Sequence, residues 1–290
     1  MKLSETHPHA YGMLATALGV LVFVPDALLL RLIGGDVLAM AFWRGILAGS
    51  VFLFWSYFVS GAPRMSIKQS ISGPYLLIAI FEGGSMVLFC ASIGHTSVSN
   101  TLFIFSTAPF IAAVLSWIFL RELIPLQTIM AIFVSMIGVI VIVSGSFGDG
   151  SLLGDGLAFL NACTVAGFYV VLRKIKSDNI FPSLGAGYII GALAVSPFAN
   201  FESYSITQAG LLLLNGALII PLAIGLLSIG PRYLPAAEVS MFSVLEVIFA
   251  PLLVWIVLGE NPGGRSIFGG IVILTAIFAH TFWRLKYNKE

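Results

Sequence analysis

Five ionisable residues stand inside long apolar stretches of this sequence: Asp26, Arg44, Glu82, Glu238 and Glu246. A charge in apolar surroundings is costly unless it is paired, protonated or bound to a ligand. A carboxylate can take up a proton or bind the amine of an organic cation, and an arginine can hold a carboxylate through two parallel hydrogen bonds. These five residues are therefore the first candidates for a functional site.

The stretches around them have the length and composition of membrane-spanning helices. Of the 290 residues, 59% are hydrophobic and only 9% are charged, whereas an average soluble domain is about 25% charged. A helix needs about 20 apolar residues to cross a bilayer, and runs of this length recur along the whole chain. We predict ten spans, at about residues 10–33, 36–60, 74–93, 97–120, 125–145, 151–173, 182–200, 206–228, 233–258 and 264–284.

The basic residues predict the orientation of these spans. With ten spans, both termini lie on one side, and the other side holds only Arg31 and Arg265. The basic residues on the side of the termini are Lys2, Arg64, Lys68, Arg121, Arg173, Lys174, Lys176, Arg232, Arg284, Lys286 and Lys289. Such an excess marks the cytoplasmic side. We therefore expect an integral protein of the bacterial inner (plasma) membrane with cytoplasmic N- and C-termini.

Several classes of function are not indicated. The net charge of +1 is too balanced to suggest a nucleic-acid partner. The four scattered histidines and the two cysteines, Cys90 and Cys163, lack the spacing of metal ligands, so we expect no metal site and no cofactor. The sequence has no HExxH motif, no GxSxG nucleophile elbow and no Walker loop, which argues against an enzyme and against transport driven by ATP.

Two similar segments indicate an internal duplication. NTLFIFSTAPFIAAVLSWIFLREL, residues 100–123, aligns with EVSMFSVLEVIFAPLLVWIVLGEN, residues 238–261, at an offset of 138. GILAG and GYIIG place a pair of small residues in the second helix of each half, where helix backbones can approach closely. Because each half has five helices, the second enters the membrane from the opposite side. We predict two inverted repeats, residues 1–147 and 148–290, an arrangement typical of secondary transporters.

The ten-helix layout and SNTLFIFSTAPFIAAVLSWIFLRE, followed by a glycine-rich helix, resemble the drug/metabolite transporter superfamily, EamA branch. The same signature is resembled by a later segment, LPAAEVSMFSVLEVIFAPLLVWIVLGENP. Two segments of the first two helices, PDALLLRL and FWRG, also look like those of members of that branch. The resemblance implies an all-α integral membrane protein of ten transmembrane helices in two inverted five-helix repeats. It also implies a central cavity, lined by the first, third, fourth, sixth, eighth and ninth helices, that takes amino acids, amines, drugs, nucleotide sugars or other metabolites.

The charged residues have both structural and functional interpretations. Asp26 and Arg44 lie at nearly the same depth on adjacent antiparallel helices, so they could form an ion pair or contact the substrate directly. Glu82 and Glu246 lie near the middle of the third and ninth helices. Each could bind a proton or the cationic group of a substrate, or form a hydrogen bond to a neighbouring helix. Glu238, near the cytoplasmic end of the ninth helix, could be a gate or a helix cap.

Other residues could assist them. On the ninth helix, Phe242 falls within the same arc of about 100° as Glu238 and Glu246, which would suit an organic cation or simply be packing. Four prolines inside spans are candidate bends for gating: Pro25, Pro109, Pro221 and Pro251. Four polar residues could bind a solute or bridge helices: Asn100, Thr107, Asn161 and Asn215. Of these we favour Asn100 and Thr107.

We expect a secondary transporter that moves a small amine-bearing or zwitterionic, amino-acid-like metabolite by alternating access. Export or exchange is favoured by the resemblance, with protons as a candidate coupling ion. The alternatives are import or facilitated movement of a carboxylate, nucleoside or nucleotide derivative and, more remotely, an intramembrane enzyme or a channel. The expected partners are the substrate and the lipid bilayer, and a monomer and a homodimer both remain open.

Overall fold

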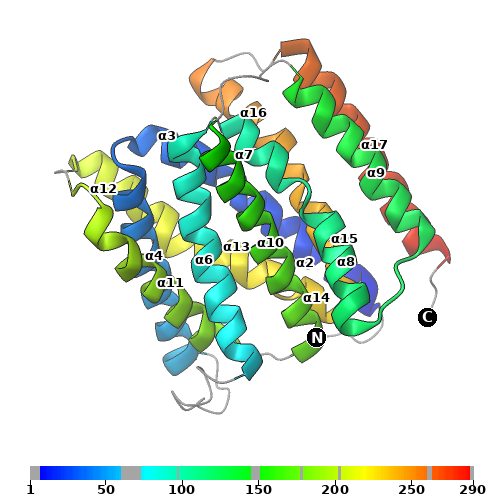
Figure 1. Ribbon diagram of the computed structural model, residues 1–290, viewed down its shortest axis with the longest axis horizontal. Helices are drawn as coiled ribbons and strands as arrows, with labels where there is room; N and C mark the ends of the chain where they lie inside the picture. Colours follow the sequence, from blue (N-terminus) through cyan, green and yellow to red (C-terminus); the bar gives the residue numbers. More distant parts are fainter. Residues whose placement is uncertain are drawn as a thin grey trace.

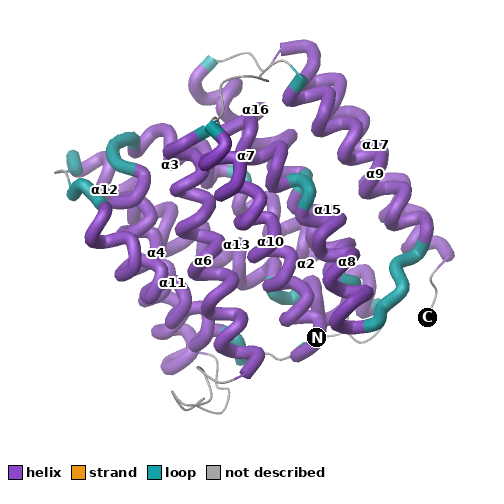
Figure 2. Tube along the Cα trace, in the orientation of Figure 1, coloured by secondary structure: helices purple, strands orange, loops and turns teal. Residues whose placement is uncertain are grey.

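The computed structural model describes residues 7–59, 73–96, 98–144, 151–176, 179–201, 204–259 and 263–287, and this part of the chain is a bundle of helices without strands (Figure 2). The first half contains α2 Pro8–Phe23, α3 Pro25–Ile33, α4 Val37–Phe54, η1 Trp55–Val59, α6 Gly73–His95, α7 Val98–Phe105, α8 Ala108–Leu120 and α9 Leu126–Val143. The second half contains α10 Leu152–Ile175, α11 Phe181–Val195, η2 Ser196–Phe198, α12 Ile206–Leu213, η3 Leu214–Ile219, α13 Ile220–Leu227, α14 Gly230–Tyr233, α15 Ala236–Ser243, α16 Leu245–Leu258 and α17 Gly263–Tyr287.

The predicted spans correspond in order to helical segments of the structure. Within the described residues, eight segments are long and apolar enough to cross a membrane: Pro8–Ile33, Val37–Phe58, Gly73–His95, Thr101–Leu120, Leu152–Ile175, Phe181–Phe198, Ile206–Tyr233 and Ala236–Leu258. Two shorter apolar helices, Leu126–Val141 and Ile267–Trp283, occupy the places of the fifth and tenth predicted spans. The all-α membrane fold is confirmed, and the count of ten depends on including these two shorter helices.

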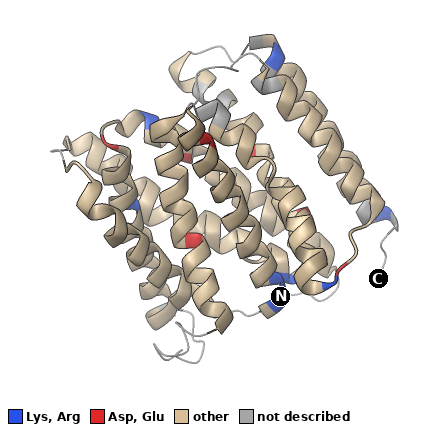
Figure 3. Cartoon of the chain, in the orientation of Figure 1, with Lys and Arg blue, Asp and Glu red and all other residues tan. Residues whose placement is uncertain are grey.

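The described chain begins at His7 and ends at Tyr287 at the same end of the bundle, which we call the terminal end (Figure 1). The second half starts with α10 at the opposite end, so its helices run inverted relative to those of the first half. The loops and helix ends at the terminal end carry most of the described lysines and arginines outside the spans (Figure 3). The opposite end carries Arg31 and Arg265.

Three interruptions within the spans bear on the site. α2 gives way to α3 at Val24, α7 to α8 at Ser106 and Thr107, and α15 to α16 at Val244. Pro25 and Pro109 have no amide proton to donate to the carbonyl four residues earlier, which accounts for the first two breaks. At Val244 the backbone instead makes bonds three residues apart, from Val244 N to Met241 O at 3.2 Å and from Val247 N to Val244 O at 3.1 Å.

Glycines allow α11 to lie very close to both α4 and α6. A Cβ atom on Gly49 would come within 2.9 Å of the carbonyl oxygen of Gly185. A Cβ atom on Gly83 would collide with the backbone of Gly187. By contrast, a Cβ atom on Gly84 would meet nothing within 4 Å. The small-residue pairs of the second and seventh spans thus lie where the two repeats pack together.

Candidate functional site

A cavity lies near the middle of the bundle, next to all three helix breaks. Phe23, Phe105 and Ser243, each adjacent to a break, form part of its wall. Its other lining residues come from α2, α4, α6, α10, α11, α13 and α16. The cavity has a volume of about 80 Å³, which is room for a few water molecules. A larger solute therefore requires the lining side chains to move apart.

Glu82 lies on this cavity with its side chain held by a tyrosine. Tyr188 of α11 donates a hydrogen bond to Glu82 Oε1 at 3.0 Å, and Glu82 is only 5% exposed. α11 brings this hydroxyl within reach because Gly187, the residue before Tyr188, packs directly on Gly83. The close helix approach and the hydrogen bond thus arise from the same segment.

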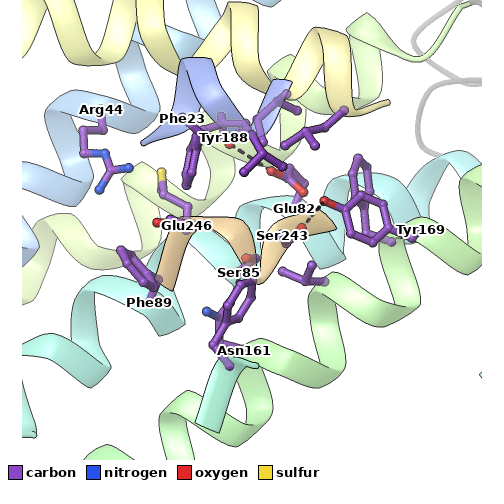
Figure 4. Close-up of a pocket in the computed structure, with 17 residues that line it drawn as sticks. Phe23, Arg44, Glu82, Ser85, Phe89, Asn161, Tyr169, Tyr188, Ser243 and Glu246 are labelled. Carbon is purple, nitrogen blue, oxygen red and sulfur yellow. Dashed lines mark hydrogen bonds between the residues drawn. The ribbon is translucent and has the colours of Figure 1, made fainter. Parts of the chain in front are cut away.

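Glu246 contributes a second carboxyl group from the first turn of α16 (Figure 4). It is 5% exposed, and its Oε1 has no hydrogen-bond partner among the described residues. The partial positive charge at the start of a helix favours a carboxylate in this position. Glu246 is therefore a buried acceptor with unused hydrogen-bonding capacity on the cavity.

Arg44 lies on the cavity wall and is paired with Asp26 behind it. Arg44 Nη2 donates to Asp26 Oδ1 at 2.8 Å, and Asn215 Nδ2 of η3 donates to the same oxygen at 2.7 Å. Asp26 is fully buried in the first turn of α3. Arg44 Nε has no hydrogen-bond partner in the described structure, so the guanidinium group has a donor left for a ligand.

Uncharged polar groups also lie on the cavity wall, among apolar side chains (Figure 4). Ser85 donates to Asn161 Oδ1 at 2.7 Å. The hydroxyl groups of Tyr169 and Ser243 lie 3.4 Å apart. These pairs join α6 to α10 and α10 to α15, so they fix the relative positions of helices around the cavity.

The structure brings together only some of the residues that the sequence predicted for the site. Glu82, Glu246 and Arg44 line the cavity, and Asp26 supports Arg44 from behind. Thr107 does not line it and instead donates to the carbonyl of Ile104 at 2.6 Å. The side chains of Asn100 and Pro251 lie outside the described part of the chain.

Two predictions on the ninth span need correction. Phe242 lines a separate apolar cavity with Leu245 and Phe249, while Glu246 lines the polar one, so the predicted arc of about 100° covers two cavities. Glu238 makes no side-chain cap hydrogen bond at the start of α15, where it is fully buried against other helices, and its role as a gate stays a prediction.

The prolines are placed at changes of helix geometry. Pro25 and Pro109 follow breaks, and Pro221 follows the π-helical turn η3. Asn161 and Tyr188 were not favoured from the sequence, although both line the cavity. Tyr188 lies inside the GYIIG segment, so its position in a helix-packing motif was the available signal.

Side chains of both repeats also meet at the terminal end of the bundle. Arg173 Nε of α10 donates to Glu122 Oε1 at 2.9 Å, and its Nη1 donates to the carbonyl of Arg232 at 3.4 Å. The rings of Tyr11 and Tyr233 pack edge to face, with centroids 5.4 Å apart. These contacts join α2, α10 and α14 between the cavity and the terminal end.

Two inverted sets of helices around a polar cavity at mid-depth define the class of the protein as a membrane transporter. The family model described as "EamA-like transporter family" matches residues 10–144 and again residues 152–282. The chain therefore belongs to the EamA-like transporter family, whose members are transporters and not enzymes.

Individual relatives agree with this family. The chain is 24% identical over 238 residues to "Uncharacterized transporter YdfC" of Bacillus subtilis (strain 168), covering 74% of this chain and 72% of the relative. It is also 24% identical over 177 residues to "Uncharacterized transporter YyaM" of the same organism, covering 59% and 58%. A solved crystal structure matches with a TM-score of 0.79 at 14% identity, over 97% of this chain and all of that one, which shows the same fold.

Proposed function

We propose that this transporter carries a small zwitterionic, amino-acid-like solute, with the solute's amine bound by Glu246 and its carboxylate bound by Arg44. The observation that carries the proposal is the buried Glu246 Oε1, which lines the cavity without a hydrogen-bond partner among the described residues. Three carboxyl groups, Asp26, Glu82 and Glu246, lie at or behind the cavity wall with one arginine. This excess of acid favours a ligand that brings a positive charge.

The apolar part of the cavity suits the remainder of such a solute. Phe23, Phe89 and Phe105 lie on the wall with Val20 and Leu227. Aromatic rings can pack against an apolar side chain or face an ammonium group. An amino acid with an aliphatic or aromatic side chain thus has a complementary group for each of its parts.

The orientation and energy source complete the proposal. The concentration of basic residues at the terminal end supports cytoplasmic termini in a bacterial inner membrane. Export or exchange by alternating access is proposed from the family resemblance, with a proton gradient as the driving force.

A thermal-shift measurement on the purified protein tests the substrate class. We propose three matched probes: leucine, leucinol, which keeps only the amine, and isocaproate, which keeps only the carboxylate. Leucine is expected to raise the melting temperature most, and leucinol is expected to raise it more than isocaproate. Glu246→Gln should abolish the response to leucinol, whereas the matched change Glu122→Gln at the terminal end should leave it intact. Stabilisation by isocaproate alone would show that the cavity prefers anions.

A further inference from the structure

A second buried polar cluster lies apart from the substrate cavity. Glu238, in the first turn of α15, is 0% exposed. Its Oε2 lies 3.6 Å from His9 Nε2 of α2, and its Oε1 lies 4.0 Å from His280 Nε2 of α17. None of these three residues lines the polar cavity.

Thr128 of α9 links two members of the cluster. Its hydroxyl group donates to Glu238 Oε1 at 3.4 Å and lies 3.0 Å from His280 Nε2. A hydroxyl group has one proton to donate, so when it is given to Glu238, His280 Nε2 must be the donor in the second contact. This arrangement places a proton on the imidazole nitrogen that faces the cluster.

The chemistry of the cluster is that of a proton site. A buried carboxylate requires a compensating positive charge, and imidazole is the side chain whose charge changes near neutral pH. The side chain of His9 is 22% exposed, whereas those of Glu238 and His280 are 1% exposed. His9 therefore connects the buried carboxylate with water at the terminal end.

Two arginines near this end interact with residues outside the cluster. Of the helices packed against α15, α10 presents Arg173, which is bound to Glu122, and α14 presents Arg232 close to Tyr11 of α2. α8 and α9 carry no charged residue within their bounds, and α16 carries Glu246 on the substrate cavity. On α17, the side chain of Arg284 lies outside the described part of the chain.

We propose that Glu238, His9 and His280 form a proton-binding site, separate from the substrate cavity, whose protonation holds α2 and α17 against α15. One proton enters from water at the terminal end, binds an imidazole nitrogen and is held by the Glu238 carboxylate. No other bond forms or breaks. The four residues of the cluster come from both repeats, so separating the repeats at this end must also separate the charges.

Proton binding and closure of the terminal end are then linked. If the proton is held by the packed arrangement and released when water reaches Glu238, a higher proton concentration favours the packed arrangement. Glu238 lies five residues before Ser243, about 7.5 Å along the helix axis, so a movement of α15 reaches the wall of the substrate cavity. This link to transport rests on the function proposed above, whereas proton binding itself does not.

Histidine NMR on the full-length protein in lipid nanodiscs tests the site directly. The chain has four histidines, and His9→Gln and His280→Gln would assign the two signals of interest. Glu238→Gln is expected to weaken proton binding at these two histidines by at least about tenfold, which is one unit of pH. Glu122→Gln is the matched control, since it removes a carboxylate from the same end, and it should leave both titrations unchanged. Equal titrations in the wild type and in Glu238→Gln would overturn the proposal.

Transport measurements separate this inference from the proposed function. With a solute identified by thermal shift, His9→Gln should leave solute stabilisation intact and remove the dependence of the transport rate on pH at the terminal end. His9→Gln also serves if Glu238→Gln does not fold, because its side chain is partly exposed. A rate with unchanged pH dependence would overturn the coupling. If no amine or amino acid stabilises the protein while the histidine titrations shift as expected, the proposed substrate is wrong and the proton site stands.

Discussion

Two parts of the cavity wall carry buried charge in opposite ways. Behind the part of the wall formed by α4, Asp26 of α3 receives hydrogen bonds from both Arg44 and Asn215. On the wall formed by α16, Glu246 has an oxygen with no hydrogen-bond partner in the described structure. Asp26 Oδ2 and Arg44 Nε also lack a hydrogen-bond partner in the described structure, so the difference lies in the countercharge: Asp26 and Arg44 form an ion pair, whereas Glu246 has no ion-pair partner among the described residues. A buried charge with a countercharge is part of the fold, whereas one without a countercharge is available to a ligand. Loss of the Asp26–Arg44 pair should therefore lower stability, in addition to removing the contact proposed between Arg44 and the solute's carboxylate, whereas loss of Glu246 should chiefly affect binding.

The largest effect is expected from breaking the paired wall. Arg44→Met removes the guanidinium group and leaves Asp26 buried without its countercharge, which should cost about 3 to 5 kcal/mol of stability. The melting temperature of the purified protein would report this loss. Adding Asp26→Asn should recover much of it, because the orphaned charge is then gone. An unchanged melting temperature in Arg44→Met would contradict the assignment of a structural pair.

The unpaired wall should respond in the other way. Glu246→Gln is nearly isosteric and removes a charge that no described residue satisfies, so the melting temperature without ligand should change little. Affinity for an amine-bearing solute should fall at least tenfold, or about 1.4 kcal/mol. Calorimetric titration of the variant and the wild type measures both outcomes on one preparation. A large loss of stability with unchanged affinity would show that Glu246 stabilises the fold and does not bind the solute.

A smaller loss of stability than that of Arg44→Met is expected from one of two neighbouring glycines on α6. Gly83→Ala forces a methyl group against the backbone of Gly187, which should destabilise the protein by about 1 to 3 kcal/mol. Gly84→Ala places the same group where nothing lies within 4 Å, so its effect should be close to zero. Thermal unfolding of both variants measures the difference. Gly84→Ala is the control, because it adds the same methyl group at the next position of the helix. Equal losses would show that α6 and α11 do not pack as described.

The smallest effect is expected from loss of the hydrogen bond between Tyr188 and Glu82, which joins the two repeats. Tyr188→Phe removes the donor to Glu82 and should cost about 1 kcal/mol. If Glu82 remains structural like Asp26, the loss appears in the melting temperature. If Glu82 turns instead toward the solute, solute affinity changes, and an isothermal binding measurement distinguishes the two results.

The sequence predicted the parts of this site that follow from depth in the membrane. Asp26 and Arg44 could be placed at the same depth because each helical residue rises by a constant distance, and the structure contains that ion pair. Their third partner, Asn215, was among the polar residues that could bridge helices, but its contact with Asp26 could not be predicted because it comes from a distant span. The all-α membrane fold likewise followed from the length and composition of the apolar runs.

The face of each helix was harder to predict than its depth. A constant rotation per residue put Phe242 and Glu246 within one arc of about 100°, but the two residues line different cavities. The sequence does not show where along such an arc one cavity ends and the next begins. The cluster around Glu238 was missed for a related reason, since His9 and His280 approach it from two other helices and have no characteristic spacing along the chain.

The breaks themselves occupy matching places in the two repeats, since Ser106 and Val244 are separated by the same 138 residues that align the repeated segments. Backbone amides beside a break are held by weaker or shorter-range hydrogen bonds than those within a continuous helix, and they exchange with deuterium more readily. Alternating access requires the two repeats to exchange roles during the cycle. Deuterium uptake at the two breaks should therefore change in opposite directions when the transporter is trapped facing one side or the other. The ratio of the two uptakes would then report which side the transporter faces.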